Sequence, residues 1–378
     1  MSACYLTFDA EFKWANNRFW KEGDKPWVPM MSGGLLAMSK QWWDELGGYD
    51  PEMRGWGGEN IDQSLRIWMC GGEIVSVQDS YIAHMWRDNS NSKTVAKYHA
   101  VGDPKRNRWR AASAWLGPFK DVVLKYPEFR RFQRGPAEDL SSYDDVKQRL
   151  HCKSFASYIE RFSDIYFKSG VLPTYTFALE SLQHPGYCLT AHDLKLGHAQ
   201  VAEGKIGIEK CDGMSRMQTW HHANREHTRE DDYENPASFH SLRLYQSDQT
   251  VRYHDGKFDT SVAVIDGSDP SQTAVWKKAS VQGEQGRQGE RMQRKGRIML
   301  QGYDQCLSVA SESGTLFLAG KSCMQVQEHA IPLPPKNRLP LWKKIDVTKS
   351  KERRIYERLK KKEKREKERQ EKIEAGVR

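Results

Sequence analysis

Glycine pairs and an acidic residue near a tryptophan stand close together in residues 31–87. The run includes Ser32-Gly33-Gly34, then Trp56-Gly57-Gly58-Glu59-Asn60, and later Gly71-Gly72. Glycine lets the main chain approach a sugar or a phosphate with no side chain in the way, and it tolerates positive φ in turns. The series therefore indicates backbone that lies against a ligand. For any single pair, a loop joining two core elements is the alternative, and Glu59 alone could be a first-turn acid favoured by the helix dipole.

Short helices and strands must hold these residues in place. A helix is predicted from Lys40 to Leu46, because Ser39 can cap its start and Gly47-Gly48 ends it. Further helices are expected over residues 60–69, 107–115, 145–152 and 155–162. Strands are expected over residues 5–8, 12–14, 35–38, 73–77 and 81–86. This order of elements is typical of half an α/β unit, in which a ligand lies where the loops gather.

From about residue 173 the sequence changes to three modules of short strands. Each module ends near a tryptophan, at Trp220, Trp276 and Trp342. Such a repeat is typical of one apolar unit used three times about a pseudo-threefold axis, so these tryptophans are expected in its core. The first module contains Cys188 and Cys211, the third contains Cys306 and Cys323, and the middle module contains no cysteine. Each of the two pairs would close one module as a disulfide.

The seven cysteines are widely spaced and none lies in a CxxC motif, which favours disulfides over a zinc site. The count is odd, and Cys4 is the natural unpaired residue. No run of 18 apolar residues and no signal-peptide layout occurs, so we expect no membrane segment in this chain.

The net charge of +9 is concentrated at the C-terminal end. Residues 349–378 contain fourteen Lys and Arg against seven Glu, so the body is close to neutral and gives no support for nucleic-acid binding. Pairs of Glu before Lys four residues apart, such as Glu357 and Lys361, support a charged helix there, with disorder as the alternative. The segment has almost no apolar stripe. We expect it to pack on nothing, with contact to an acidic partner as the second possibility.

Several motifs resemble the polypeptide N-acetylgalactosaminyltransferases, which start mucin-type O-glycosylation. The resemblance covers residues from about 5 to 330. It is carried by these segments: Ser32-Gly33-Gly34-Leu35-Leu36-Ala37-Met38, Glu45-Leu46-Gly47-Gly48-Tyr49-Asp50, Trp56-Gly57-Gly58-Glu59-Asn60, Arg66-Ile67-Trp68-Met69-Cys70-Gly71-Gly72, Ala83-His84-Met85-Trp86-Arg87 and Leu150-His151-Cys152-Lys153-Ser154-Phe155. The three later modules are similar to the family's ricin B-type β-trefoil lectin domain. The resemblance implies part of a GT-A α/β catalytic domain over residues 1–165, a trefoil over 173–347, and a charged tail over 348–378.

The resemblance also implies roles for individual residues. Glu59 and Asn60 would line the donor-sugar pocket beside Gly33 and Gly34. Trp56 and Arg87 would contact the nucleotide diphosphate, with Arg87 neutralising the leaving group. The acceptor groove would be shaped by Trp86, Phe8, Phe12 and Trp14. His84, which on its own could be a core histidine, would be a Mn²⁺ ligand. Cys70 and Cys152 match a family disulfide pair.

Three departures from the family pattern bear on function. The family's N-terminal half of the catalytic domain, with its Asp-x-His metal motif, has no counterpart here. Asp9-Ala10-Glu11 is assigned no metal role, because it sits beside the acceptor-side aromatics. The lectin's sugar-binding Asp is replaced by Thr190 in the first module and Ser308 in the third. Asp193 could substitute, so a working lectin and a trefoil that no longer binds sugar both stay open.

The activity implied is retaining transfer of N-acetylgalactosamine from UDP-N-acetylgalactosamine (UDP-GalNAc) to Ser or Thr of an acceptor polypeptide, in the Golgi lumen and with Mn²⁺. The trefoil would contact GalNAc-glycopeptides. Because the nucleotide-binding side is missing, the 378-residue chain alone is expected to show no turnover. A non-catalytic carbohydrate-binding or scaffolding protein derived from the family is the alternative.

Overall fold

The structure is a computed structural model of the 378-residue chain. It describes the following residues: 3–15, 25–77, 79–83, 101–124, 126–168, 171–173, 175–192, 203–212, 215–223, 240–245, 249–254, 257–262, 274–278, 295–300, 306–313, 315–321 and 342–374. The chain divides into two compact units: unit 1 comprises residues 1–163 and 355–378, and unit 2 comprises residues 164–354. Within the described ranges, no helix is long and apolar enough to cross a membrane.

Unit 1 begins with an antiparallel hairpin of two strands, β1 (Ala3–Leu6) and β2 (Phe12–Ala15). A tight turn joins them, in which Thr7 N donates to Glu11 O over 2.9 Å and Ala10 adopts φ 52°. Cys4 is buried and unpaired, as its place in the sequence predicted, and burial raises the pKa of its thiol to about 12.

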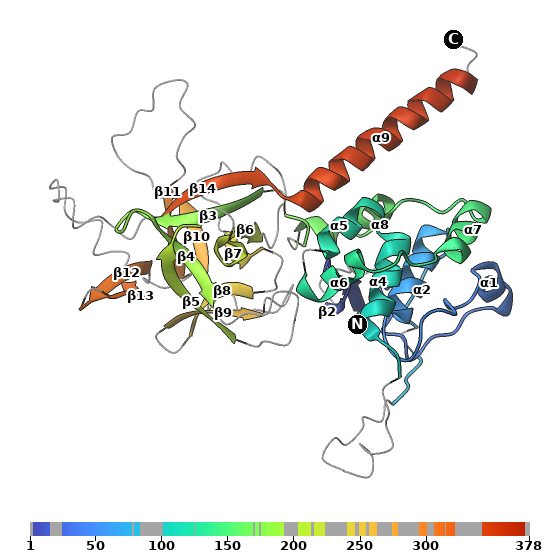
Figure 1. The fold of residues 1–378 in the computed structure, drawn as a ribbon, viewed down its shortest axis with the longest axis horizontal. Coiled ribbons are helices and arrows are strands. Elements are labelled where there is room, and N and C mark those ends of the chain that lie inside the picture. The colour runs from blue at the N-terminus through green and yellow to red at the C-terminus, as the bar shows by residue number, and fades with distance from the viewer. Residues whose placement is uncertain are drawn as a thin grey trace. The chain divides into compact units, whose positions relative to one another are not determined.

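The other regular elements of unit 1 are helices (Figure 1). The α-helices are α1 (Lys40–Glu45), α2 (Glu59–Met69), α4 (Pro104–Trp115), α5 (Lys120–Val123), α6 (Arg130–Arg134), α7 (Ser141–Arg149) and α8 (Phe155–Arg161). Two 3₁₀ turns, Gly117–Phe119 and Pro127–Phe129, lie between them. The predicted cap of α1 is confirmed, because the Ser39 hydroxyl accepts from Trp42 N. The helices expected near residues 60–69, 107–115, 145–152 and 155–162 all form.

Two expected strands of unit 1 do not form. Residues 35–38 have no regular structure, and Leu35 and Leu36 are exposed, so the prediction of a buried strand was wrong. In residues 73–77 there is one isolated bridge, between Val75 and Trp27. An apolar run predicts a strand only if a neighbouring strand is available to pair with it. Within the described part of unit 1, β1 and β2 form the only two-stranded sheet, and β1 makes one further isolated bridge, between Cys4 and Met30.

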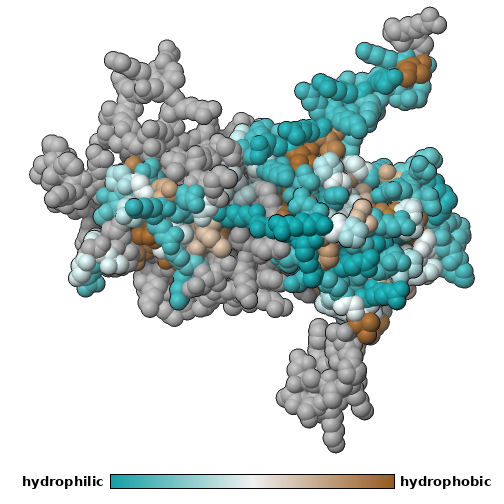
Figure 2. All heavy atoms as spheres, viewed as in Figure 1, coloured by the Kyte–Doolittle hydropathy of each residue, from teal (hydrophilic) through white to brown (hydrophobic). Residues whose placement is uncertain are grey.

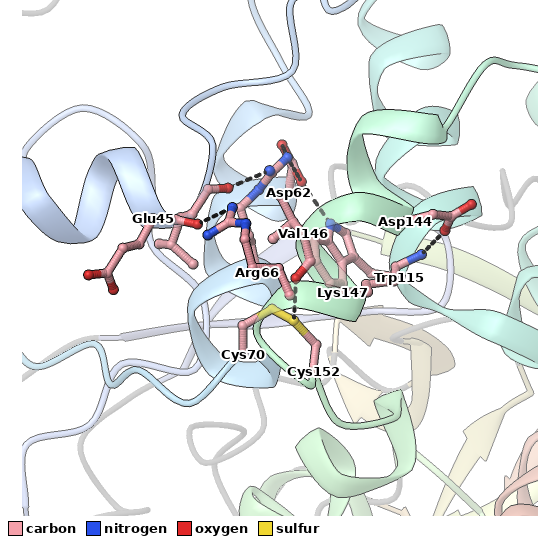
Figure 3. Close-up of a disulfide and its surroundings, with 11 residues drawn as sticks. Glu45, Asp62, Arg66, Cys70, Trp115, Asp144, Val146, Lys147 and Cys152 are labelled. Carbon is pink, nitrogen blue, oxygen red and sulfur yellow. Dashed lines mark hydrogen bonds and ion pairs between the residues drawn. A yellow bond between two sulfur atoms is a disulfide. The ribbon is translucent and has the colours of Figure 1, made fainter.

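Helix α2 is the centre of unit 1, with every residue from Asn60 to Met69 buried. Its charged side chains must therefore find partners inside the protein. Arg66 donates to both carboxylate oxygens of Asp62 at 2.9 and 3.1 Å and to Leu46 O at 2.8 Å. Trp115 Nε1 donates to Asp62 at 2.7 Å, so one buried pair ties α2 to the end of α1 and to α4 (Figure 3).

A second buried charge cluster lies between α4 and α7. Arg110 donates to both oxygens of Asp50 at 2.7 and 3.1 Å, and Tyr143 Oη donates to Asp50 at 2.8 Å. Burial opposes ionisation of Asp50, but these bonds outweigh it and hold its pKa below the usual value. At the other end of α2, Cys70 is bonded to Cys152, which confirms the implied pair and fixes the helix to the loop after α7 (Figure 3).

The C-terminal segment forms α9 (Lys351–Glu374). The expectation that this segment packs on nothing was wrong, because α9 contacts other residues of unit 1. Lys360 Nζ bonds Glu160 of α8 at 2.8 Å, and Ser154 donates to Glu363. The helix thus uses polar contacts, which the search for an apolar stripe could not find.

Unit 2 begins with a π-helical turn, Asp164–Lys168, and is otherwise built of β-strands with one short 3₁₀ turn, Arg216–Gln218. The strands are β3 (Tyr175–Ser181), β4 (Tyr187–His192), β5 (Glu203–Lys210), β6 (Trp220–Ala223), β7 (His240–Leu244), β8 (Gln249–His254), β9 (Lys257–Val262), β10 (Ala274–Lys278), β11 (Lys295–Leu300), β12 (Cys306–Glu312), β13 (Thr315–Lys321) and β14 (Trp342–Lys349). All pairings among them are antiparallel.

The pairings close a ring of six strands. Going round it, β3 pairs β6, β6 pairs β7, β7 pairs β10, β10 pairs β11, β11 pairs β14 and β14 returns to β3. The remaining strands form three hairpins, β4–β5, β8–β9 and β12–β13. Each module therefore supplies two ring strands and one hairpin, which is the threefold repeat that the sequence predicted.

The core of unit 2 uses the same position of each hairpin. Leu189, Val251 and Leu307 occupy it and are fully buried. Trp220 is also fully buried and donates to Leu189 O at 3.0 Å, whereas the side chains of Trp276 and Trp342 lie outside the described residues. The predicted Cys188–Cys211 disulfide forms. Cys306 is disulfide-bonded, and its predicted partner Cys323 lies outside the described residues.

Candidate functional site

The candidate site lies at the N-terminal end of α2, where Glu59 and Asn60 form the first turn. The helix starts after Gly58, which has φ 90° and offers no side-chain cap. Glu59 and Asp62 place negative charge in this first turn, where the free N–H groups and the helix dipole favour it. The position of Glu59 therefore agrees with its being a first-turn acid favoured by the helix dipole. That interpretation does not explain the contacts around Glu59.

The loop before α1 is fastened to this turn. Asn60 Nδ2 donates to Met31 O at 3.1 Å, and Met31 N donates to Ser64 Oγ at 3.0 Å. Two residues on, Gly33 has φ 94°, and a Cβ there would lie 3.1 Å from Asn60 Cβ and 3.7 Å from Glu59 Oε1. A Cβ on Gly34 would meet no atom of the described residues within 4 Å. The structure therefore brings Gly33, Glu59 and Asn60 together, with open space beside Gly34.

Unpaired polar atoms are buried on this face of α2. Glu59 Oε2 is buried and has no hydrogen-bond partner among the described residues. Gln63 lies one turn later, on the same face, and its side-chain oxygen and nitrogen are both buried and unpartnered within the same ranges. A buried polar atom without a partner costs about 1–3 kcal/mol, and such atoms are rare in native proteins. Three of them on one helix face indicate that a further group completes the site.

Sequence reasoning missed two residues of this site. Gln63 gave no signal, because a glutamine inside a helical pattern reads as a surface residue until the helix is shown to be buried on all sides. Tyr49 stands in a segment that carried the resemblance but received no role. Tyr49 is 43% exposed, and partial burial and then the charges of Glu59 and Asp62 raise the pKa of its hydroxyl group.

The glycines next to Glu59 are explained by packing, which corrects the expectation that they approach a ligand. A Cβ on Gly58 would lie 2.7 Å from the backbone carbon of Asn107, and one on Gly57 would lie 3.1 Å from Pro104 Cβ. Both belong to the first turns of α4. Asn107 also clamps the preceding loop by bonding Arg54 O at 3.0 Å. Trp56, by contrast, is 66% exposed and free to contact another molecule.

The aromatic residues expected at the acceptor groove lie in different environments. Phe8 is buried and stacks on Phe119 with ring centroids 5.7 Å apart, so its ring serves the core instead of an open groove. Phe12 is half-buried. The side chain of Trp14 and all of Trp86 lie outside the described residues.

The described residues do not by themselves fit a metal site. Within them, no three His, Cys, Asp or Glu side chains are grouped so that they could hold an ion. His84 and Arg87 lie outside these ranges. Asp9 accepts from Thr7, and Glu11 pairs with Arg108.

The positions expected to bind sugar in unit 2 are filled by internal hydrogen bonds. Thr190 is buried, donates to Cys188 O at 2.9 Å and accepts from Gln218 Nε2 at 3.0 Å. Gln218 also donates to Lys210 O at 3.0 Å and accepts from Asp212 N at 2.7 Å. Ser308 is buried and donates to Ala319 O at 3.0 Å. Asp193 lies outside the described residues.

Comparison with known proteins gives matches along part of the chain. Residues 21–87 match the family model described as the N-terminal domain of galactosyltransferase. The chain is 32% identical over 188 residues to polypeptide N-acetylgalactosaminyltransferase 8 of Drosophila melanogaster, covering 46% of this chain and 30% of that protein. It is 33% identical over 192 residues to polypeptide N-acetylgalactosaminyltransferase 5 of Caenorhabditis elegans, covering 51% and 29%. The chain thus spans about a third of the length of these relatives.

Among solved structures, a crystal structure of GalNAc-T7 with UDP, GalNAc and Mn²⁺ aligns with a TM-score of 0.41 and 18% identity, covering 93% of this chain and 56% of that one. A similarity at that level carries no argument about this site.

Proposed function

We propose that this chain, which is related to the polypeptide N-acetylgalactosaminyltransferases, supplies the donor-sugar side of a retaining glycosyltransferase. The proposed reaction transfers N-acetylgalactosamine from UDP-GalNAc to a Ser or Thr hydroxyl of an acceptor polypeptide. The relatives that it matches are named as transferases of this kind, which favours the transferase over a non-catalytic scaffold.

The observation that carries the proposal is the carboxylate of Glu59, whose Oε2 is buried without a partner among the described residues and whose Oε1 would lie 3.7 Å from a Cβ on Gly33. A carboxylate oxygen in this setting needs a hydrogen-bond donor, and the hydroxyl groups of a sugar are donors of suitable size. Asn60 donates to Met31 O and so holds the loop that contains Gly33 against the first turn of α2. Open space beside Gly34 leaves room for a ring. The catalytic assignment of Glu59, Asn60 and Arg87, and the nucleotide contacts of Trp56 and Arg87, are parts of the same proposal.

The surface of unit 1 supports a site that is completed by further polypeptide. Eight of the ten large apolar side chains that are exposed within the described ranges lie in residues 21–87, the segment that matches the family model. They are Leu35, Leu36, Tyr49, Trp56, Val75, Val77, Tyr81 and Ile82. So many apolar groups in one segment are typical of a surface that another domain covers. In this proposal the covering part binds the nucleotide, and His84 with Mn²⁺ would belong to the completed site.

Unit 2 fits a β-trefoil of the ricin B type, because its ring of six strands and three hairpins has the required connectivity. The internal bonds of Thr190 and Ser308 favour a structural trefoil at those two positions over one that binds GalNAc-glycopeptides there. The Cys70–Cys152 and Cys188–Cys211 disulfides fit an oxidising compartment, in agreement with the proposed Golgi lumen.

Saturation-transfer NMR with the 378-residue chain and UDP-GalNAc tests the proposal. We expect saturation on the N-acetylgalactosamine protons and little on the uridine protons, because the sugar side of the site is present. Glu59→Gln should weaken the sugar signal at least severalfold, since it replaces the acceptor oxygen with a donor. Glu45→Gln, an acid-to-amide change at the end of α1, is the matched control and should leave the signal unchanged.

Two results would overturn the proposal: no saturation of the sugar, or equal saturation in wild-type protein and Glu59→Gln. Turnover is measured separately, with Mn²⁺ and a Ser/Thr peptide. The chain alone is expected to show no transfer, and a nucleotide-binding half taken from a relative and added in trans is expected to restore it. Transfer by the chain alone would show that the site needs no further part.

A further inference from the structure

Most of the positive charges of helix α9 fall into two groups, which differ in whether they form ion pairs. One group forms a stripe: Arg354, Arg358, Lys361, Arg365, Arg369 and Lys372. The steps between them are three or four residues, which places all six on one face of the helix. Over 18 residues at 1.5 Å each, this cationic stripe is about 27 Å long.

The six side chains of the cationic stripe are exposed, and none forms an ion pair or hydrogen bond with any residue that the structure describes. Four acids of α9 pair with the other group of cations. Lys362, Lys364 and Lys367 pair with Glu366, Glu368 and Glu371, at 3.6, 3.8 and 3.7 Å. Lys360 pairs with Glu160 and Glu363. These four lysines are therefore paired with acids, whereas the six cations of the stripe have no such partner among the described residues.

The contacts of α9 within unit 1 fix which way the cationic stripe faces. Lys360 bonds Glu160 of α8, and Glu363 accepts from Ser154, the residue before α8. At about 100° per residue, Glu363 lies on the side of the helix opposite Arg354. The stripe is therefore turned away from the side that packs on unit 1, and the visible surface of α9 is mostly hydrophilic (Figure 2).

A row of like charges one helical turn apart repels itself, and a partner with a matching row of negative charges would relieve that repulsion. A membrane surface fits poorly, because an interfacial helix needs an apolar face. From Lys364 to Glu374 every residue is exposed and the only large apolar side chain is Ile373. The partner that fits is a linear polyanion that follows the helix axis.

The disulfides decide between classes of polyanion. Disulfides persist in oxidising compartments and outside the cell, where nucleic acids are scarce. We propose that the cationic stripe of α9 binds a sulfated polysaccharide of the glycosaminoglycan class. This surface is separate from the candidate site at Glu59 and does not depend on the transferase activity.

The test is calorimetric titration of the 378-residue protein with a heparin oligosaccharide at several salt concentrations. Lys361→Gln/Arg365→Gln/Arg369→Gln removes three charges from the stripe. Lys362→Gln/Lys364→Gln/Lys367→Gln removes three charges that are already paired with acids of the helix and is the matched control. Glutamine is a good helix former, so circular dichroism should show helix content retained in both.

We expect the stripe variant to weaken binding roughly tenfold or more at low salt and to reduce the salt dependence, because binding releases counterions in proportion to the contacts made. The variant of the three paired lysines should change affinity less than about twofold, since each of them already forms an ion pair with a glutamate. Equal losses in the two variants, or no binding beyond that of uncharged dextran, would overturn the proposal. Tighter binding of double-stranded DNA or of anionic lipid vesicles would also overturn it.

Discussion

Two buried glutamines, one in each unit, show how differently the two halves of this protein use polar groups. Gln218 of unit 2 is 2% exposed and uses both of its N–H groups and its oxygen, in bonds to Thr190, Lys210 and Asp212. Gln63 of unit 1 is 0% exposed, and neither its oxygen nor its nitrogen has a partner among the described residues. The glutamine amide is thus fully hydrogen-bonded in unit 2, whereas in unit 1 it has no partner among the described residues.

The difference separates polar groups whose hydrogen bonds are complete from polar groups that still need a partner. In unit 2, the hydroxyl and amide groups at the positions where the resemblance implies a sugar acceptor bond groups of their own unit. In unit 1, Glu59 and Gln63 keep buried polar atoms without partners among the described residues on one face of α2, and Glu59 lies beside Gly33. An unsatisfied buried group persists only where another interaction supports the elements that carry it. Here that support comes from the charge clusters around α2 and α4.

The largest effect is therefore expected from breaking this support. Arg110→Ala removes both bonds to Asp50 and leaves a buried carboxylate without its cation. Loss of one partner of a buried pair costs about 3–5 kcal/mol. We expect hydrogen–deuterium exchange to show faster exchange throughout the helices of unit 1 and unchanged exchange in the strands of unit 2.

Arg106→Ala is the control for Arg110→Ala. Arg106 belongs to the same helix and also bonds Glu138, at 2.8 and 3.1 Å, but its side chain is 37% exposed. Its loss should cost under about 1 kcal/mol. If both variants destabilised unit 1 equally, the buried pair would not be the support proposed.

The sequence predicted the helices of unit 1 better than its strands. Helix caps and stops are local signals, so Ser39 and Gly47-Gly48 were enough to place α1. Whether residues 35–38 form a strand depends on a neighbour that can pair with them, and sequence pattern alone says nothing of that. In unit 2 the recurrence of a tryptophan at the end of each of three modules of short strands predicted a threefold repeat, although only the first and third modules contain cysteines.

The sequence predicted the residues of the candidate site that belong to a motif. It did not predict those whose role depends on how deeply they are buried. Glu59 and Asn60 followed from the resemblance, and the structure brings Gly33 against them. The role of Gly57 and Gly58 was misjudged, because a glycine that packs against a helix and one that admits a ligand look alike in sequence. Gln63 could not be found at all. Only the complete burial of α2 shows that its amide is unpaired.

An intermediate effect is expected from replacing each glutamine with methionine, which keeps the length of the side chain. Gln218→Met leaves Asp212 N, Lys210 O and the Thr190 hydroxyl without this partner and should destabilise unit 2 by about 1–3 kcal/mol. Gln63→Met removes an amide that has no partner and should leave unit 1 unchanged or more stable by about 1 kcal/mol. Chemical denaturation with exchange detected for each unit measures both.

The pair of variants also separates stability from binding. Gln63→Met should weaken saturation transfer from N-acetylgalactosamine if its amide faces the sugar, while Gln218→Met should leave that signal unchanged. A destabilised Gln63→Met, with a loss equal to that of Gln218→Met, would mean that Gln63 has a structural partner. The contrast between the two units would then fail.

The smallest expected effect is the change in the stability of unit 1 as the pH is lowered. The bonds from Arg110 and Tyr143 hold the pKa of Asp50 below its usual value. A lowered folded-state pKa stabilises the protein fully above the unfolded value of about 3.9, and the stabilisation is lost as pH falls through the folded value. Asp50→Asn should therefore destabilise unit 1 at neutral pH, and the difference from wild type should shrink below about pH 4.

Thermal unfolding followed by near-ultraviolet circular dichroism, from about pH 7 to about pH 3, measures this difference. Asp144→Asn, an exposed change on α7, serves as the control and should give a small difference at every pH. A difference for Asp50→Asn that stays constant down to the lowest pH would show that hydrogen bonding alone, which asparagine partly keeps, explains the role of this residue. Loss of the difference on acidification would show that the charge of Asp50 maintains the scaffold on which the open face of α2 depends.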